Sequence, residues 1–285
     1  MRIHHLSCGS MCPYGGGLWD GVTAGLGPAT IVCHCLLIET EQGLVLVDTG
    51  FGLRDVAQPT PRLSPLFLTV NRIRLRAEET ARHQIAALGL DPADVRHIVL
   101  THLDFDHAGG IEDFPQATVH VMEAELAAAA ARRSLLDRGR YRPMQWDENV
   151  KWRRYRPDGE RWFGFDSVRA IDGLPPEILF VPLAGHTTGH AGIAIRLRHS
   201  WLLHAGDAYF YEGEMDMRGY RCTPMMRFYQ KMMEVDRGQR LANQHRLREL
   251  KHAHGGEVEL FCAHDRKEFD RMAAASPVAV EPAAA

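Results

Sequence analysis

The sequence lacks a long apolar run and a leader-like start. No stretch of the 285 residues approaches the roughly 20 consecutive apolar positions that a membrane-spanning helix needs. Residues 1–6 continue into Ser7, Cys8 and Gly9 without the apolar segment of a secretory signal. We therefore expect a cytoplasmic protein that contacts no membrane.

A strong charge of one sign is also missing. The 33 Lys and Arg residues and 36 Asp and Glu residues give a formal net charge of -3, whereas nucleic-acid binding usually leaves a concentrated positive patch. Residues 151–156 are basic and aromatic, but they hold only four cations, so we interpret them as a solvated or lid-forming loop. We expect a small-molecule substrate and no nucleic-acid partner.

Cysteines are too few for a disulfide framework. The six cysteines are spread over a long chain, and a reducing compartment would keep them as thiols. Cys8 with Cys12 and Cys33 with Cys35 could form half of a zinc site, but no matching second pair follows. Buried packing residues are the favoured interpretation.

What the sequence does contain is a dense cluster of metal-ligand side chains. Residues 101–110 read Thr-His-Leu-Asp-Phe-Asp-His-Ala-Gly-Gly, and they follow a short apolar strand predicted at residues 95–100. Four side chains able to bind a metal therefore lie on one turn at the end of a strand: His102, Asp104, Asp106 and His107. Helix-capping and turn aspartates beside incidental histidines would be the bland alternative.

Three further strand ends carry ligand types. His186 follows an apolar strand at residues 178–183, Asp207 follows residues 201–206, and His264 follows residues 258–262. Each alone would be an ordinary polar loop residue. Because a pair of divalent ions needs ligands from several loops, their shared position indicates one metal centre.

In order along the chain, these motifs resemble the metallo-β-lactamase superfamily. The resemblance starts at Val47-Asp48-Thr49-Gly50 and ends at His264. It implies an α/β fold, specifically a four-layered αββα sandwich, with Asp48 orienting the ligands. It also implies one metal on His102, Asp104 and His186. A second metal would lie on Asp106, His107 and His264, with Asp207 between the two.

The chain departs from the family pattern at Asp104, where a histidine usually stands. A carboxylate remains a competent ligand, and it shifts the site towards harder ions such as Mn²⁺ or Fe²⁺ without excluding Zn²⁺. Two divalent ions are expected, Zn²⁺ first, with Mn²⁺ or Fe²⁺ as alternatives. The additional negative charge should weaken the pull of the metals on bound water. Alternatively Asp104 is too short to reach, and the first metal rests on His102, His186 and Asp207.

One domain over residues 1–275 is expected, followed by a flexible tail at 276–285. A hairpin is predicted at residues 30–38 and 44–48, with helices near 77–89, 123–136, 224–235 and 238–253. Strands near 178–183, 191–197, 201–206 and 258–262 complete the alternation. His190, just beyond His186, is expected to support a ligand.

Two segments fall outside this alternation. Residues 59–70 form a proline-broken, exposed apolar loop, and residues 141–165 are rich in aromatic side chains. Both could line or cover a substrate cleft, or could form an oligomer contact such as a homodimer interface or a small satellite core.

The predicted function is metal-dependent hydrolysis. A hydroxide held between two ions attacks a carbonyl carbon, while Asp106 or Asp207 orients it and passes its proton to the leaving group. Tyr209 and Tyr211 could donate to the developing oxyanion. The Gly-His-Thr-Thr-Gly-His form at 185–190 and the Ala-His-Asp ending at 263–265 look most like acyl-homoserine lactonases, which implies a lactone or other (thio)ester substrate. A phosphodiesterase or nuclease, a diiron redox enzyme and a non-catalytic metal-binding descendant are the alternatives.

Overall fold

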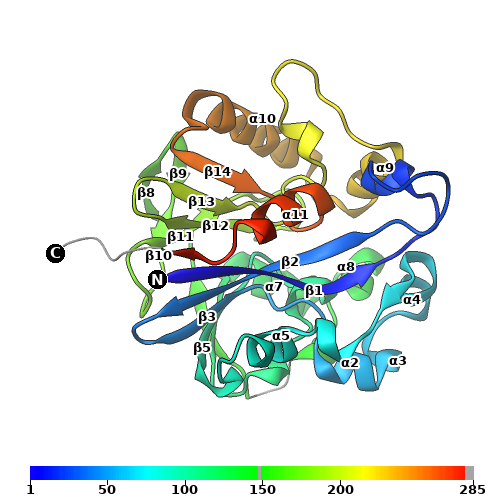
Figure 1. The fold of residues 1–285 in the computed structure, drawn as a ribbon, viewed down its shortest axis with the longest axis horizontal. Helices are drawn as coiled ribbons and strands as arrows, with labels where there is room; N and C mark the ends of the chain where they lie inside the picture. Colours follow the sequence, from blue (N-terminus) through cyan, green and yellow to red (C-terminus); the bar gives the residue numbers. More distant parts are fainter. Residues whose placement is uncertain (147–148, 280–285) are drawn as a thin grey trace.

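Two β-sheets packed face to face form the centre of the protein, in a computed structural model that describes residues 1–146 and 149–279 (Figure 1). The first, eight-stranded sheet contains β1 (Arg2–Met11), β2 (Ile31–Thr40), β3 (Gly43–Val47), β4 (Ile73–Arg74), β5 (Val95–Val99), β6 (Thr118–Met122), β7 (Lys151–Tyr155) and β15 (Val278–Ala279). The second, five-stranded sheet contains β10 (Arg169–Ala170), β11 (Ile178–Pro182), β12 (Ala191–Arg196), β13 (Trp201–His204) and β14 (Val258–Phe261). A separate hairpin pairs β8 (Gly159–Trp162) with β9 (Phe165–Ser167).

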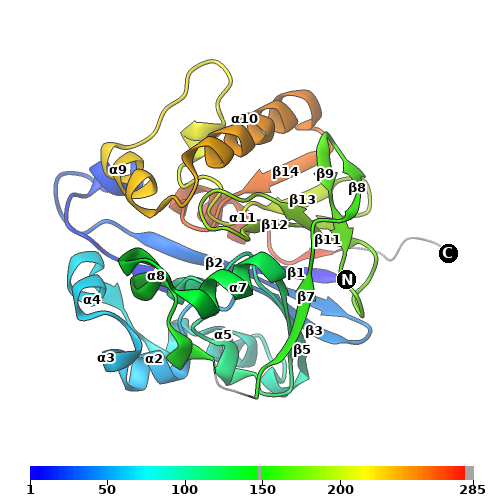
Figure 2. The same ribbon diagram turned by 180° about the vertical axis from the view of Figure 1, so that it is seen from behind.

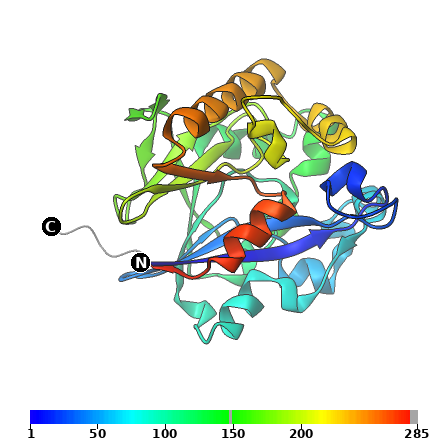
Figure 3. The same ribbon diagram turned by 45° about the horizontal axis from the view of Figure 1, so that its top comes forward.

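Helices cover the outer faces of both sheets (Figures 1 and 2). The helices of the described chain are α1 (Gly17–Asp20), α2 (Leu53–Ala57), α3 (Pro59–Arg62), α4 (Pro65–Asn71), α5 (Ala81–Ala87), α6 (Phe105–Ala108), α7 (Glu123–Ala131), α8 (Leu135–Arg140), α9 (Pro224–Met233), α10 (Arg237–His254) and α11 (Arg266–Ala274). Short 3-10 turns lie at Ala77–Glu79, Pro92–Asp94, Ile111–Asp113, Pro143–Gln145 and Glu212–Met215. Figure 3 shows α10 above the second sheet and α11 lying across β1.

Three cores hold the layers together. The inner core joins Leu36 and Val47 of the first sheet to Phe180 and Ile193 of the second. One outer core packs α5 and α7 on the first sheet, and the other packs α10 on the second sheet. The order helix, sheet, sheet, helix confirms the predicted four-layered sandwich.

The hydrophobic pattern explains why the strands lie where they do. In β2, the eight residues from Ile31 to Ile38 are all buried, as expected for a strand covered on both faces. It pairs antiparallel with β3, which confirms the predicted hairpin. Next to it, β3, β5, β6 and β7 run parallel, so their carboxyl ends meet at one edge.

Residues 59–70 are not the predicted loop. They form α3 and α4, each with a proline in its first turn, where the missing N–H has no helical partner to lose. Leu66 and Val70 are exposed, but Phe67 and Leu68 pack against a fourth core around Phe51 and Phe105.

The described residues of the segment 141–165 pack into the sheets and cores of the protein. The part that the structure describes includes β7, at the edge of the first sheet, and β8. Tyr155 lies in the inner core, Trp162 in the core under α10, and Trp152 against the core under α5 and α7. The aromatic side chains therefore fill cores that already exist.

In the predicted tail, Val278–Ala279 pairs with the start of β1, and residues 280–285 lie outside the described part. Among the helices of the described chain, none is long and apolar enough to cross a membrane.

Candidate metal centre

Five polar segments meet where strands of both sheets end. Asp48 follows β3, and residues 101–107 follow β5, both in the first sheet. His186, Asp207 and His264 follow β11, β13 and β14 of the second. All seven side chains proposed from the sequence as ligands are buried there, each at most 6% exposed.

The first group joins His102, Asp104, His186 and Asp207. Asp104 Oδ2 lies 3.1 Å from His186 Nε2 and 3.5 Å from His102 Nε2. Asp207 Oδ2 lies 3.3 Å and 3.7 Å from the same two nitrogens. The carboxylate of Asp104 therefore reaches the group, contrary to the alternative in which it is too short.

The second group joins His107, His264 and Asp207, with Asp106 beside it. Asp207 Oδ1 lies 3.4 Å from His107 Nε2 and 3.2 Å from His264 Nε2. His264 Nε2 also lies 3.5 Å from Asp106 Oδ2. Because Asp207 offers one oxygen to each group, it is placed to bridge them.

These distances fit divalent metal ions. Four ligands at about 2.0–2.1 Å around a tetrahedral ion stand about 3.3 Å apart, close to the separations in both groups. His102 Nε2 and Asp207 Oδ1 are buried and have no hydrogen-bond partner. Such atoms are costly to bury unpaired, and a metal ion would satisfy both.

Hydrogen bonds accepted by Asp48 orient His107 directly and His102 through the hydroxyl of Thr101. Its Oδ2 accepts from His107 Nδ1 at 2.8 Å and from the hydroxyl of Thr101 at 2.8 Å. That hydroxyl lies 2.8 Å from His102 Nδ1. Nε2 of each ring is thereby turned toward the centre, as expected for supported metal ligands. Asp48 has a φ of 56°, a sparsely populated conformation for a side chain of this kind.

His190 and a backbone carbonyl orient the ligands of the second sheet. His190 Nε2 accepts from the backbone N–H of Asp207 at 2.8 Å, and its Nδ1 faces the carbonyl of Leu183 at 3.1 Å. His264 Nδ1 donates to the carbonyl of Val32 at 2.7 Å. His190 thus supports Asp207 through the backbone.

The two neighbouring histidines of the turn differ in protonation. Burial and the neighbouring His107 lower the pKa of His102 to about 4, so its Nε2 has a free lone pair. Burial also lowers the pKa of His107, but Asp207 and Asp48 outweigh it and raise that pKa to about 10. A metal ion at the second group must therefore displace a proton from His107.

Sequence analysis missed Arg140, which contacts Asp104. The guanidinium Nε and Nη2 donate to the two carboxylate oxygens of Asp104, each at 2.8 Å. Burial raises the pKa of Asp104, but Arg140 outweighs it and holds that pKa well below its ordinary value. The two residues are 36 positions apart and share no motif, so no local pattern could have linked them.

Glu125 was missed for the same reason. Its buried carboxylate accepts from the backbone N–H groups of Leu103 and Gly189, both at 3.0 Å. It therefore ties the turn of His102 to the loop of His186. In the sequence it is one glutamate in an alanine-rich helix, where a solvent-facing position was equally plausible.

The predicted role of Tyr209 is wrong. Its buried hydroxyl donates to both carboxylate oxygens of Glu268 at 3.0 Å, within the core under α10. The hydroxyl of Tyr211 lies against Gly21. The Tyr209 hydroxyl is therefore engaged by Glu268 instead of facing the ligand groups.

Tyr229, on α9, lies nearer the centre. Together with His264 it lines a small apolar pocket whose other walls are Met11, Trp19, Ile31, Asn71, Phe210 and Met226. Phe210 stacks on the His264 ring at 5.3 Å and meets Tyr229 edge-on. Burial, Asp106 and Asp104 raise the pKa of Tyr229, so its phenol keeps its proton. The pocket holds only about 10 Å³, roughly one water molecule.

The six cysteines are free thiols, and five of them are buried. One of the buried cysteines, Cys33, has its Sγ close to donor atoms of Asp106 and His264.

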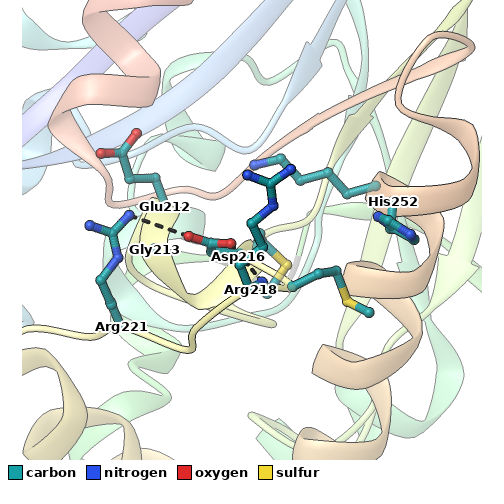
Figure 4. A pocket seen from close by; sticks show the side chains of 9 residues that line it. Glu212, Gly213, Asp216, Arg218, Arg221 and His252 are labelled. Atoms are coloured by element: carbon teal, nitrogen blue, oxygen red, sulfur yellow. Dashed lines mark hydrogen bonds and ion pairs between the residues drawn. The ribbon is translucent and has the colours of Figure 1, made fainter.

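A larger pocket of about 420 Å³ between the 212–221 segment and α10 contains Glu212, Asp216, Arg218, Arg221 and His252 (Figure 4). None of the seven ligand candidates lines it.

Comparisons with known proteins agree with this arrangement. Residues 30–251 match the family model of the metallo-beta-lactamase superfamily. A probable metallo-hydrolase of Mycobacterium tuberculosis is 43% identical over 265 residues, which cover 93% of this chain and 80% of the relative. An N-acyl homoserine lactonase of Azorhizobium caulinodans is 32% identical over 165 residues, 58% of this chain and 59% of that protein.

Solved structures share the fold. An N-acyl homoserine lactone hydrolase with N-hexanoyl-L-homoserine at its catalytic metal centre superposes with a TM-score of 0.68 at 19% identity, covering 95% of each chain. A dizinc quorum-quenching lactonase gives a TM-score of 0.60 at 16% identity, covering 93% of this chain and 87% of that one. The chain therefore belongs to the metallo-β-lactamase superfamily and is a metal-dependent hydrolase.

Proposed function

We propose that this protein is a dinuclear hydrolase that opens lactones or cleaves related (thio)esters. One divalent ion would be held by His102, Asp104 and His186, the other by Asp106, His107 and His264, with Asp207 shared. Two zinc ions suit the tetrahedral spacing of both groups, with Mn²⁺ or Fe²⁺ as alternatives. Such ions supply a hydroxide nucleophile at neutral pH and polarise a substrate carbonyl.

The observation that carries the substrate class is the apolar pocket beside His264. Its lining residues include no lysine, arginine or carboxylate. A neutral acyl group suits such walls, whereas a phosphodiester would leave its charge without a cation there. The lactonase names of several relatives and structural neighbours favour the same class.

Tyr229 and Asp106 would have different roles in the reaction. Tyr229 would donate its phenolic hydrogen to the oxygen that becomes negative when the carbonyl is attacked. Asp106 would take the proton of the attacking hydroxide and pass it to the leaving alkoxide. Burial raises the pKa of Asp106. Burial also acts to raise the pKa of Asp207, but His264 and His107 outweigh it and hold that pKa well below its ordinary value.

The test is a comparison of substrates on protein of known metal content. Protein reconstituted separately with Zn²⁺, Mn²⁺ and Fe²⁺ would be assayed with an N-acyl homoserine lactone, an acyl thioester and a phosphodiester. We expect the lactone to be hydrolysed fastest. Fully loaded protein that cleaves only the phosphodiester, or nothing, would contradict the proposal. A cytoplasmic location remains our prediction from the sequence, with a homodimer as one option.

A further inference from the structure

Arg140 is a buried cation beside the first ligand group. It is the last residue of α8 and is 0% exposed. Its Nε and Nη2 donate to Oδ1 and Oδ2 of Asp104 at 2.8 Å, and its Nη1 donates to the carbonyl oxygens of His186 and Met233 at 3.1 Å. The guanidinium is therefore held from both sides and cannot turn away without leaving buried donors unpaired.

The two oxygens of Asp104 have different surroundings. Oδ2 faces the ligand group, 3.1 Å from His186 Nε2 and 3.5 Å from His102 Nε2. Both oxygens accept from Arg140 at 2.8 Å, Oδ1 from Nε and Oδ2 from Nη2, so only Oδ2 also faces the ligand group. A fork of two parallel hydrogen bonds fixes the plane of a carboxylate, so Arg140 holds Asp104 in the orientation in which Oδ2 faces the ligand group.

Charge gives a second reason for the pairing. Two divalent ions with Asp104, Asp106, Asp207 and one hydroxide would sum to zero. Arg140 returns the total to one positive charge, which is also the total for a centre with a neutral histidine at position 104. The earlier expectation of a less electropositive centre counted Asp104 without its partner.

We propose that Asp104 and Arg140 act as one unit that replaces a neutral histidine ligand: Arg140 neutralises the additional carboxylate and points its Oδ2 at the first metal. This makes Arg140 a positioning residue for the first metal ion. The inference rests on the metal centre of the proposed function, and on no particular substrate.

A competing role follows from one further contact. Arg140 Nη2 lies 2.9 Å from His186 Nε2, the atom that would bind the metal. If the guanidinium held this nitrogen permanently, Arg140 would exclude the first ion instead of supporting it. The two roles predict opposite effects of removing the cation, because support is lost in one case and a block is relieved in the other.

Metal binding by four variants separates these roles. They are Arg140→Met, Asp104→His, the double variant Asp104→His/Arg140→Met, and the control Arg138→Met, which removes an exposed arginine of the same helix. Metal content would be measured by elemental analysis, and Zn²⁺ affinity by competition with a chromophoric chelator. Circular dichroism and thermal melting would establish that each variant folds.

Arg140→Met should weaken the first Zn²⁺ site by about 10–100-fold, the usual loss when a residue supporting a ligand is removed. Asp104→His should be impaired as well, because it leaves a buried guanidinium unpaired beside two cations. The double variant, with a neutral ligand and no cation, should regain Zn²⁺ binding at the first site, and Arg138→Met should match the parent.

The proposal is overturned if Arg140→Met binds two ions as tightly as the parent or more tightly. It also fails if the double variant binds no better than Asp104→His. Because the readout is metal affinity, these outcomes are independent of the substrate. Protein that loads two ions but hydrolyses no lactone or thioester contradicts the proposed function and leaves the role of Arg140 intact.

Discussion

The hydroxyl groups of two tyrosines near the metal centre have different surroundings, and removing each should have a different effect. Tyr229→Phe should lower kcat by about 10²–10³-fold, the usual effect of losing one oxyanion donor, with metal content unchanged. Tyr209→Phe should instead cost about 1–2 kcal/mol of unfolding free energy, because its hydroxyl pairs with buried Glu268. Kinetics and denaturant titration of both variants would check this, and a kcat loss confined to Tyr209→Phe would reverse the assignment.

His264 should be needed for the second ion only. Its Nε2 faces Asp207 and Asp106, while its Nδ1 is held by the carbonyl of Val32. His264→Ala should therefore reduce the metal content from about two ions to one per chain and remove most activity while the fold persists. His252→Ala, an exposed histidine of α10, is the matched control. Equal metal content in both variants would disprove the placement.

Glu268 should make stability fall as the pH rises. Burial and Asp265 raise its pKa to about 7 in the folded protein, above an ordinary value of 4.5. The folded state therefore binds the additional proton, so this stabilisation is complete below about pH 4.5 and is lost as the pH rises through 7. Relative to Glu268→Gln, the parent should lose up to roughly 3 kcal/mol between pH 5 and 8. Parallel pH dependence of the two unfolding free energies would rule this out.

Single residues also show what sequence can and cannot reveal. The ligand candidates could be found because each follows an apolar strand, and this local pattern is visible in the sequence. Arg140 and Tyr229 could not, since they reach the centre from α8 and α9 through packing that has no local pattern. Tyr209 was misplaced because nearness to Asp207 in sequence does not fix the direction of a side chain.

Among the elements, α1 and α9 together close the apolar pocket. Trp19 of α1 meets Tyr229 of α9 edge-on at 6.2 Å, and Thr223 donates to the carbonyl of Trp19 at 2.7 Å. Because a volume of about 10 Å³ admits no acyl chain, the proposed binding of substrate in this pocket requires these side chains to move. Trp19→Phe should enlarge the pocket and shift kcat/KM toward longer acyl chains, by up to about tenfold.

The control for Trp19 is Leu18→Ala on the same short helix, whose side chain is 44% exposed. The measurement is kcat/KM over a series of acyl chain lengths. An unchanged preference in Trp19→Phe would show that the pocket does not receive the acyl group.

The elements themselves were predictable where periodicity was strong. The hairpin of β2 and β3 and the long helix α10 lie close to their predicted ranges, because β2 is a continuous apolar run and the buried residues of α10 recur at helical spacing. Residues 59–70 were misassigned because proline was taken to break a helix, whereas Pro59 and Pro65 begin one. The strand β7 was not predicted, because the charged residues within 151–156 were interpreted as a loop.

For the whole molecule, the proposed metal centre would join the two sheets. His102, Asp104, Asp106 and His107 extend from the first sheet, while His186, Asp207 and His264 extend from the second. Chelation should therefore lower the melting temperature of the entire protein in one transition. Zn²⁺ at 100–1,000 times its Kd should restore about 3–4 kcal/mol. Separate melting of the two halves, or no change on chelation, would contradict this.

The edges of the first sheet have a consequence for how the protein behaves in a crowded solution. At one edge the exposed side chains of Lys151, Arg153 and Arg154 project from β7, and at the other Val278–Ala279 covers the start of β1. Unpaired edges invite strands from neighbouring molecules, and lysine or arginine side chains discourage such growth. Replacing these cations with valine would turn β7 into a template for fibril-like stacking, even though no residue of the metal centre had been touched.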